Sequence, residues 1–434
     1  MPTCLVNLAH LDPPQVGGLS RIAREVSRLL LERSDIRTVF AVNATFAPAF
    51  MDWISQPAIV IPYIGRSNPS WILSLCQPDL IVSPLFGLHP FTSDHALRAA
   101  HIVSIPDALS LDMPDLFAPA DRAYRQGVYA MLIHARRVVT LSEHARGRLL
   151  HHLPLKPEQV RVVPLGSDAT AADDSHPPLN DLPAHYVLYP ANLWPHKRHD
   201  LLLRTMHLVW RQQPDLHLVL TGGGRSADQV TRLMDVLSET DRGRVHDLGF
   251  VEDARLDALY RRAEALVFTS RYEGFGMPLV EAMRNDCPVI CAPLTSIPEV
   301  VGDAALFVQS DEPADWARAI CDELPARRAE LIAAGRARAE HFTWARARQG
   351  WDAALREVLP ESTPLPSQTT QIADSLRPLL NQIADARLGE LRFAERAPSP
   401  GLRRPFQLAY RLSRLPTIRS AQTQIRHLIR SFLA

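Results

Sequence analysis

The segment Ser270–Arg284, with the sequence SRYEGFGMPLVEAMR, decides how this 434-residue chain folds. It follows a short aliphatic run, Ala265–Thr269, which has the length and composition of a buried strand. Gly274 and Gly276 then form a tight loop. Pro278 suits the first position of a helix, where its missing N–H would have no partner in any case. The segment therefore predicts a strand, a glycine loop and a helix N-terminus.

A loop of this kind is a ready site for an anion. We expect the backbone N–H groups of residues 276–279 to point out of the helix, together with the positive end of its dipole. Glu273 precedes the loop, and Glu281 follows in the first helical turn. A carboxylate accepts two hydrogen bonds at once, so each one suits the vicinal hydroxyls of a sugar. The pattern indicates a phosphate between two sugars, which is the outline of a nucleoside diphosphate sugar. Alternatively, Glu281 only decorates the helix terminus and Glu273 is a solvated loop charge.

Aliphatic runs alternate with helical stretches along most of the chain. Continuous apolar strands separated by helices are typical of parallel sheets that are covered on both faces. The polar segment Ala169–Pro183 has the composition of a linker. We therefore predict an α/β protein in which two doubly wound Rossmann-like domains, 1–170 and 184–360, face each other across a cleft. A helical basic tail, 361–434, follows them.

Composition excludes several classes of protein. A hydrophobic content of 46% is too high for a chain that is disordered throughout. No apolar run approaches the roughly 18 residues that span a bilayer. The N-terminal sequence lacks the regions of a signal peptide. The five cysteines are odd in number and scattered, which favours a reducing cytoplasm over a disulfide framework.

The formal net charge is zero, but the charges are unevenly placed. Seven arginines and no acidic residue lie between Ala397 and Ala434. Within this stretch the apolar residues Ile425, Leu428, Ile429 and Phe432 follow helical spacing, with Arg426 and Arg430 among them. This pattern predicts that 401–434 lies on an anionic membrane surface, as a peripheral contact with the inner leaflet. Equally, the helix can pack back on the protein or pair with another chain. Few aromatic residues accompany the arginines, so nucleic acid is not an expected partner.

Lysine is rare in this chain, since only Lys156 and Lys197 are lysines among 47 basic residues. Lys197 stands in YPANLWPHKRH, just after the strand that contains Tyr186. An ammonium group and a guanidinium group are not interchangeable, so a lysine kept against this arginine background suggests a function. We expect Lys197 to neutralise a departing diphosphate. Taken alone, it is better explained as a surface charge.

The string EGFGMPLVEAM, with two glutamates eight residues apart, resembles the signature of the family 4 glycosyltransferases, which share the GT-B fold. Leu248–Asp253, Ser296–Val308 and Val138–Leu149 resemble further segments of that family, and the likeness covers roughly residues 3–360. The resemblance implies a retaining transfer of a hexose from a nucleoside diphosphate sugar to a glycan or a lipid-linked acceptor, with no further cofactor. The Trp-Pro-His-Lys string ending at Lys197 resembles bacterial mannosyltransferases of surface polysaccharides. GDP-mannose is therefore the first donor expected.

The resemblance also implies roles for particular residues. Glu273 and Lys197 are the expected catalytic residues that act on the donor. Where the family has a His-Asp pair, this chain has Pro106 and Asp107, so the catalytic contact falls to Asp107 unless that residue only caps its loop. The donor-binding residues implied are Gly17, Gly18, Asn192, His196, Lys197, Arg225, Phe250, Glu273, Gly274, Phe275, Gly276, Met277, Pro278, Leu279 and Glu281.

The sequence departs from the family at a second cation. The family has an arginine where this chain has Asn192, and Arg198 and Arg225 are the candidates to replace it. No Asp-x-Asp motif occurs, so no metal site is expected, and cations and backbone dipoles must meet the leaving-group charge. A catalytically silent GT-B scaffold and a sugar-nucleotide epimerase of the same fold are the alternatives. The presence of Glu273, Lys197 and Glu281 favours a transferase over both.

Overall fold

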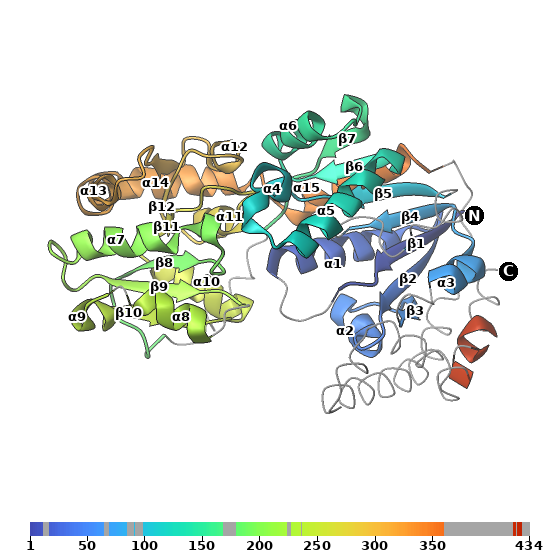
Figure 1. Ribbon diagram of the computed structural model, residues 1–434, viewed down its shortest axis with the longest axis horizontal. Coiled ribbons are helices and arrows are strands. Elements are labelled where there is room, and N and C mark those ends of the chain that lie inside the picture. Colours follow the sequence, from blue (N-terminus) through green and yellow to red (C-terminus); the bar gives the residue numbers. More distant parts are fainter. Residues whose placement is uncertain are drawn as a thin grey trace.

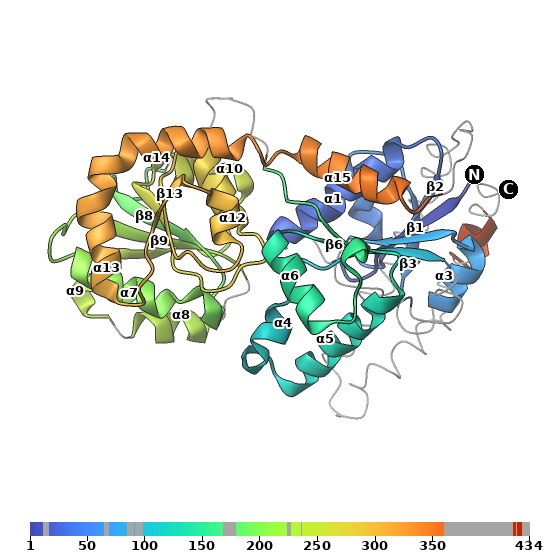
Figure 2. The same ribbon diagram turned by 90° about the horizontal axis from the view of Figure 1, so that it is seen from above.

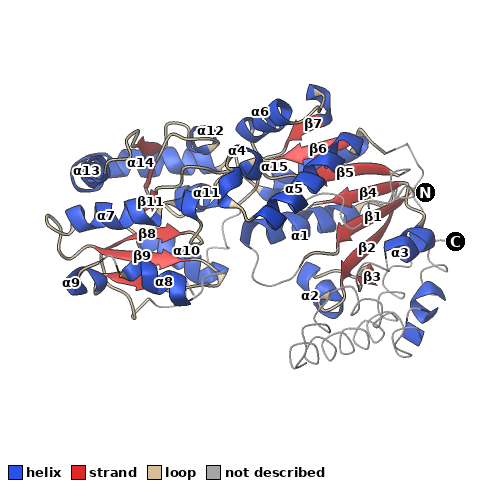
Figure 3. Cartoon of the chain, viewed as in Figure 1, coloured by secondary structure: helices blue, strands red, loops and turns tan. Residues whose placement is uncertain are grey.

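The computed structural model describes residues 1–11, 17–64, 69–84, 91, 99–167, 179–223, 227–235, 237–359, 420–421 and 423–427. Two parallel sheets lie side by side, each with helices on both faces (Figures 1 and 2). Colouring by secondary structure shows the strands of each domain enclosed between helices (Figure 3). The predicted α/β class with two doubly wound domains is confirmed.

In the described residues of the N-terminal domain, the sheet has seven parallel strands in the order β3-β2-β1-β4-β5-β6-β7. These are β1 (Thr3–Leu8), β2 (Arg37–Asn43), β3 (Ile59–Tyr63), β4 (Leu80–Ser83), β5 (Ala100–Ser104), β6 (Arg137–Thr140) and β7 (Val160–Val162). The α-helices are α1 (Gly17–Glu32), α2 (Phe50–Ile54), α3 (Pro69–Cys76), α4 (Leu109–Asp112), α5 (Pro119–Met131) and α6 (Glu143–His152). Every residue of β1 and of β4 is buried, as expected for continuous apolar strands covered on both faces.

The sheet of the C-terminal domain has the strand order β10-β9-β8-β11-β12-β13 among the residues described there. Its strands are β8 (Tyr186–Pro190), β9 (His217–Thr221), β10 (Val245–Asp247), β11 (Ala265–Phe268), β12 (Val289–Cys291) and β13 (Ala305–Phe307). Its α-helices are α7 (His199–Val209), α8 (Ala227–Met234), α9 (Glu239–Arg242), α10 (Asp253–Arg262), α11 (Met277–Arg284), α12 (Ile297–Val301), α13 (Pro313–Arg318) and α14 (Leu324–Ala339). The direction of winding reverses between β8 and β11, and ligands of such sheets bind beyond the carboxyl ends of the strands at this point.

The last helix before the basic tail, α15 (Trp344–Arg356), returns to the first domain and lies beside α1 (Figure 2). Arg33, just beyond α1, pairs with Asp352 of α15 at 2.6 Å. The two chain passages between the domains run side by side, since the N–H of Ser167 donates to the carbonyl of Phe342 at 3.0 Å. A Cβ at Gly166 would collide with the backbone of Trp344, so this position requires glycine.

The described part of the basic tail is a helix over residues 420–421 and 423–427, which lies near α3 (Figures 1 and 2). Its Ala421 and Ile425 are buried in the same apolar core as the strands. Ile425 is one of the residues expected to face a membrane, and that expectation is wrong for this side chain because the protein itself covers it. Leu428, Ile429 and Phe432 lie outside the described residues.

Two further observations bear on the class of protein. Cys4, Cys76, Cys287 and Cys291 are buried, and all five cysteines are free thiols. No helix in the described part of the chain is both long and apolar enough to cross a bilayer.

Candidate active site

Lys197 and Glu273 meet beyond the carboxyl ends of two adjacent strands. Lys197 closes a short turn, Pro195–Lys197 (η6), that follows β8, and Glu273 follows the neighbouring β11. The Lys197 Nζ lies 2.6 Å from Oε1 of Glu273, and the two side chains are 18% and 10% exposed. Charges sheltered in this way attract one another more strongly than surface charges do, because water screens them less.

The backbone around Glu273 is fixed from the side of α12. The N–H of Glu273 donates to Oγ1 of Thr295 at 3.0 Å. The hydroxyl of Ser296 donates to the carbonyls of Glu273 at 3.0 Å and Phe275 at 3.2 Å. These bonds hold the backbone from which the Glu273 side chain projects.

The glycine loop touches the N-terminal domain at Gly274. A Cβ at this position would lie 2.6 Å from the carbonyl oxygen of Pro106 and 2.8 Å from the Cβ of Asp107. The hydroxyl of Ser142, the N-cap of α6, donates to the Gly274 carbonyl at 2.8 Å. Glycine is required here, and the close approach brings Asp107 alongside the loop that carries Glu273.

Asp107 both caps a loop and lies at the candidate site. Its Oδ1 accepts the N–H of Leu109 at 2.9 Å, as the capping alternative predicts. Burial raises the pKa of the Asp107 carboxyl, and the charge of Glu273 acts in the same direction. The Leu109 N–H and the charge of Lys197 oppose that rise. The three residues expected to be catalytic are therefore within electrostatic reach of one another.

The N-terminus of α11 offers fewer N–H groups than the sequence predicts. Pro278 has none, and the N–H of Leu279 donates to the carbonyl of Gly276 at 3.0 Å. The expectation that residues 276–279 all present N–H groups is therefore wrong, because the first turn uses one of them. Gly276 and Met277 remain as the positions from which a backbone N–H can reach an anion.

Glu281 is an internal residue of α11 rather than a surface charge. It is buried, its Oε1 accepts from Nη1 of Arg21 at 2.7 Å, and its Oε2 accepts from the hydroxyl of Tyr260 at 3.1 Å. Nη2 of Arg21 also pairs with Oδ1 of Asp253 at 2.6 Å. Arg21 belongs to α1 of the other domain, so this cluster bridges the two halves of the molecule.

His196 is buried directly before Lys197. Burial, followed by the charges of Lys197 and His199, lowers the pKa of the His196 ring to about 3, so the ring is neutral at physiological pH. Among the described residues its Nδ1 has no hydrogen-bond partner. A neutral imidazole with an open nitrogen can donate or accept one hydrogen bond.

Other residues expected to bind the donor are scattered more widely. Gly17 and Gly18 are the first two residues of α1 rather than a loop before it. Asn192 is exposed beyond β8, and Phe250 is 48% exposed beside Gly223. Arg225 lies outside the described residues.

Three side chains next to the glycine loop belong to the core. Phe275 packs edge-on against Phe342 with ring centroids 5.4 Å apart, while Leu279 is fully buried and Met277 nearly so. Because these side chains are packed in the core, a donor contact at Phe275 or Met277 falls to the backbone. Arg198, a candidate for the missing cation, is paired with Asp311.

Much of the C-terminal domain matches a known protein family. Residues 173–338 match the family described as "Glycosyl transferases group 1". An O-antigen chain mannosyltransferase B of Escherichia coli is 27% identical over 304 residues, 67% of this chain and 77% of that protein. A D-inositol 3-phosphate glycosyltransferase of Corynebacterium kroppenstedtii is 29% identical, and the match spans 57% of this chain but only 59% of that relative.

The fold likeness extends over both domains. HepE of Anabaena, solved with UDP and glucose, has a TM-score of 0.61 at 19% identity, covering 82% of this chain and 100% of HepE. Sucrose-phosphate synthase of Thermosynechococcus elongatus has a TM-score of 0.62 at 20% identity, covering 82% and 98%. The predicted GT-B fold is confirmed.

The chain is a glycosyltransferase, and its residues 173–338 match the group 1 family. The interpretation of the string around Glu273 and Glu281 as a glycosyltransferase signature is thereby confirmed, because the matched residues include both. Among the described residues of this glycosyltransferase, no group of three or more His, Cys, Asp or Glu side chains is placed to hold a metal ion.

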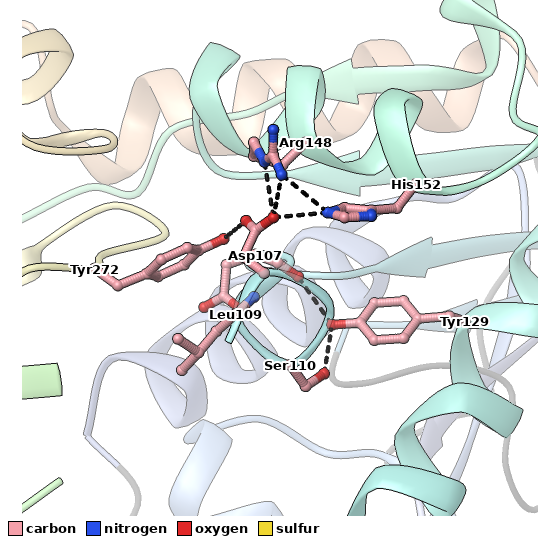
Figure 4. Close-up of polar contacts among 8 residues, drawn as sticks. Asp107, Leu109, Ser110, Tyr129, Arg148, His152 and Tyr272 are labelled. Carbon is pink, nitrogen blue, oxygen red and sulfur yellow. Dashed lines mark hydrogen bonds and ion pairs between the residues drawn. The ribbon is translucent and has the colours of Figure 1, made fainter. Parts of the chain in front are cut away.

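Asp112, at the end of α4, fastens the Glu273 loop of the glycosyltransferase to the N-terminal domain. The hydroxyl of Tyr272 donates to its Oδ2 at 2.7 Å, while Arg148 Nε and His152 Nε2 lie 2.8 and 2.7 Å from its Oδ1. Figure 4 labels these three partners, Tyr272, Arg148 and His152. Burial opposes the charge of Asp112, but the hydrogen bonds from Arg148, His152 and Tyr272 prevail and lower its pKa to about 2. Asp112 is therefore an ionised acceptor at neutral pH.

A second carboxylate joins the domains beside this contact. Glu299 of α12 accepts the backbone N–H groups of Glu143 at 2.8 Å and His144 at 3.2 Å, at the start of α6. A carboxylate at a helix N-terminus is favoured by the unpaired N–H groups and by the helix dipole.

Sequence reasoning missed Arg21, Asp112 and Tyr272. Arg21 stands among 47 basic residues, nearly all arginine, so its identity carried no signal. Tyr272 lies directly before Glu273 in the signature, and its proximity to the loop was the signal available. The sequence around Asp112 gave no signal of its role, because its partners come from α6 and from the other domain.

We predict that Tyr272→Phe lowers kcat/KM about tenfold, or about 1.4 kcal/mol, because it removes the hydroxyl that holds the Glu273 loop to Asp112. The ring remains, so the melting temperature should change little. Steady-state kinetics and thermal unfolding of the purified variant measure the two effects. Tyr124→Phe, exposed on α5, is the matched control. A folded Tyr272→Phe enzyme with the kcat/KM of the wild type would contradict the role of this contact.

Proposed function

We propose that this glycosyltransferase moves a hexose, mannose in the first instance, from GDP-mannose to a glycan or a lipid-linked acceptor, with retention of configuration. The observation that carries the proposal is the pair of Lys197 and Glu273 at the point where the second sheet reverses its winding. The O-antigen mannosyltransferases of Escherichia coli and Salmonella typhimurium among its relatives support mannose and a surface-polysaccharide acceptor. A uridine nucleotide is the second candidate, since HepE was solved with UDP.

In this proposal Lys197 exchanges one partner for another. In the structure its ammonium group is paired with Glu273. A diphosphate at the start of α11 competes for that ammonium and releases Glu273 to accept sugar hydroxyls. The charge that develops on the leaving phosphate is then met by Lys197 and by the N–H groups at Gly276 and Met277. Such preorganised donors each supply roughly 3–4 kcal/mol in comparable sites.

Asp107 lies on the acceptor side of this arrangement, on the N-terminal domain. A carboxyl group with a raised pKa is a stronger base than an exposed one, so Asp107 is suited to take the proton of an acceptor hydroxyl. The proposed route is attack from the same face that the leaving phosphate departs from. No side chain is assigned as a covalent nucleophile.

Lys197→Ala and Glu273→Ala should each reduce turnover roughly 10²-fold or more, because the first removes the cation for the leaving group and the second removes sugar positioning. Transfer and donor hydrolysis are measured with GDP-mannose, UDP-glucose and related nucleotide sugars, after a thermal-shift screen identifies those that bind. Lys156→Ala is the matched control, since Lys156 is the other lysine and is exposed. If a folded Lys197 or Glu273 variant keeps the wild-type kcat/KM, that residue has no part in the mechanism. Failure of every nucleotide sugar to bind would overturn the proposal.

We predict that transfer continues in excess EDTA, because the sequence has no Asp-x-Asp motif and the leaving-group charge has a lysine to meet it. Initial rates with and without EDTA, at constant ionic strength, provide the measurement. Complete loss of transfer in EDTA, restored by Mn²⁺ or Mg²⁺, would contradict this prediction.

The arginines of the tail extend the proposal to an anionic membrane surface at the cytoplasmic face. Each cation near such a surface contributes about 1 kcal/mol, and salt weakens the attraction. The exposed Arg426 is compatible with this contact, whereas the buried Ile425 favours a helix that packs on the protein. Charge, rather than an apolar face, is therefore the part of the tail that the proposal depends on.

Full-length enzyme should sediment with vesicles rich in anionic phospholipid at low salt. Replacing Arg426 and Arg430 together by Glu should reduce the pelleted fraction several-fold, since two attractive charges become repulsive. Replacing Arg204 and Arg318, which are each 58% exposed on the catalytic domain, is the charge-matched control. Equal pelleting of all three proteins, or none at low salt, would remove the membrane from the proposed function.

A further inference from the structure

Arg21 is placed on the carboxylate of Glu281 from the opposite domain. Its Nη1 lies 2.7 Å from Glu281 Oε1, and its Nη2 lies 2.6 Å from Asp253 Oδ1. The Arg21 and Glu281 side chains are 20% and 10% exposed, whereas Asp253 is 66% exposed. The bond of Arg21 that is sheltered from solvent is therefore the one to Glu281, and Asp253 holds the other arm of the guanidinium near solvent.

Three charged or titratable groups face Glu281. Burial raises the pKa of the Glu281 carboxyl, and the nearby charge of Asp253 adds to that rise. Arg21 from α1 opposes it through its charge and its hydrogen bond, and the Tyr260 hydroxyl from α10 opposes it through a hydrogen bond. Arg21 brings the only positive charge in this set, so its loss would favour the protonated carboxyl.

The protonation state of Glu281 decides how many hydroxyl groups it can bind. An ionised carboxylate has about four acceptor positions, of which Arg21 and Tyr260 occupy one each. The remaining positions can accept hydroxyl groups of a ligand. A protonated carboxyl loses acceptor capacity and presents a donor of its own.

Arg21 is not needed simply to hold the two domains together. Ser142 bonds to Gly274, Tyr272 bonds to Asp112, and Glu299 bonds to the start of α6. These contacts lie around the same interface and do not involve Arg21. Its position on Glu281 therefore calls for a more specific role than domain closure.

We propose that Arg21 is a positioning residue for the donor: it holds Glu281 ionised and oriented, so that Glu281 accepts hydroxyl groups of the nucleotide sugar. The inference rests on the proposed function, in which the donor lies between Glu273 and Glu281. This role makes donor binding depend on a residue of the N-terminal domain. The affinity for the donor is thereby coupled to the contact between the two domains.

Titration of full-length enzyme with GDP and with UDP, by calorimetry between about pH 6 and about pH 9, tests this inference. Arg21→Ala should weaken the nucleotide that the wild type binds by on the order of tenfold at the acidic end, the effect of one charge-assisted hydrogen bond. The deficit should shrink as pH rises, because a carboxyl with a raised pKa ionises only at higher pH. Arg21→Lys should restore most of the affinity.

Glu281→Gln serves as a permanently neutral reference. It should weaken binding at every pH, and Arg21→Ala should add little to it, since both changes remove the same acceptor. Arg24→Ala, one turn further along α1 with an ion pair only to Glu25 of its own helix in the described contacts, is the matched control. Arg21→Gln keeps a hydrogen-bonding side chain without charge, and replaces Arg21→Ala if that variant does not fold.

The possible outcomes separate this inference from the proposed function. If neither nucleotide binds the wild type, the proposed function fails. Suppose instead that the wild type binds. The role of Arg21 is overturned if the affinity of an uncharged Arg21 variant changes with pH in parallel with that of the wild type. It is also overturned if the Arg21 change weakens binding as much in the Glu281→Gln background as it does alone. A loss of affinity confined to neutral and acidic pH, absent from the Glu281→Gln background, supports it.

Discussion

The absence of a side chain at Gly274 is the constraint on which the arrangement of the two domains depends. A single methyl group there would lie 2.6 Å from the Pro106 carbonyl, too close for any ordinary contact. Because glycine removes that clash, the hydroxyl of Ser142 reaches the Gly274 carbonyl and Tyr272 reaches Asp112. The loop that carries Glu273 is thus held by both domains.

Each carboxylate of the signature has its own cation. Lys197, from a neighbouring strand end, neutralises Glu273, and Arg21, from the opposite domain, neutralises Glu281. Ion pairs sheltered from water are stable only when both charges are present, so removing one member leaves a costly buried charge. In the proposed function a diphosphate replaces Glu273 as the partner of Lys197, while Arg21 stays on Glu281. Each of the two glutamates therefore enters the site as one half of an ion pair.

The order of strands and helices could be read from the sequence because continuous apolar runs have few other solutions than buried parallel strands. Glu273 and the glycine loop could be singled out because they lie within one local string, and Lys197 because lysine is rare in this chain. Arg21 and Asp112 were not, since their partners lie in the other domain. The helical spacing that includes Ile425 predicts an amphipathic helix, but periodicity does not say whether lipid or protein covers the apolar face. Here protein covers the Ile425 side chain.

The return of α15 to α1 makes the N-terminal domain discontinuous in sequence. Its last helix, Trp344–Arg356, is synthesised only after the whole second domain. A nascent chain that has emerged as far as β7 therefore still exposes the face of α1 that α15 later covers. At that stage Arg33 also lacks its partner Asp352, which belongs to α15. The second domain can fold as a unit while the first waits for its final helix, which reverses the usual order in which N-terminal domains are completed first on the ribosome.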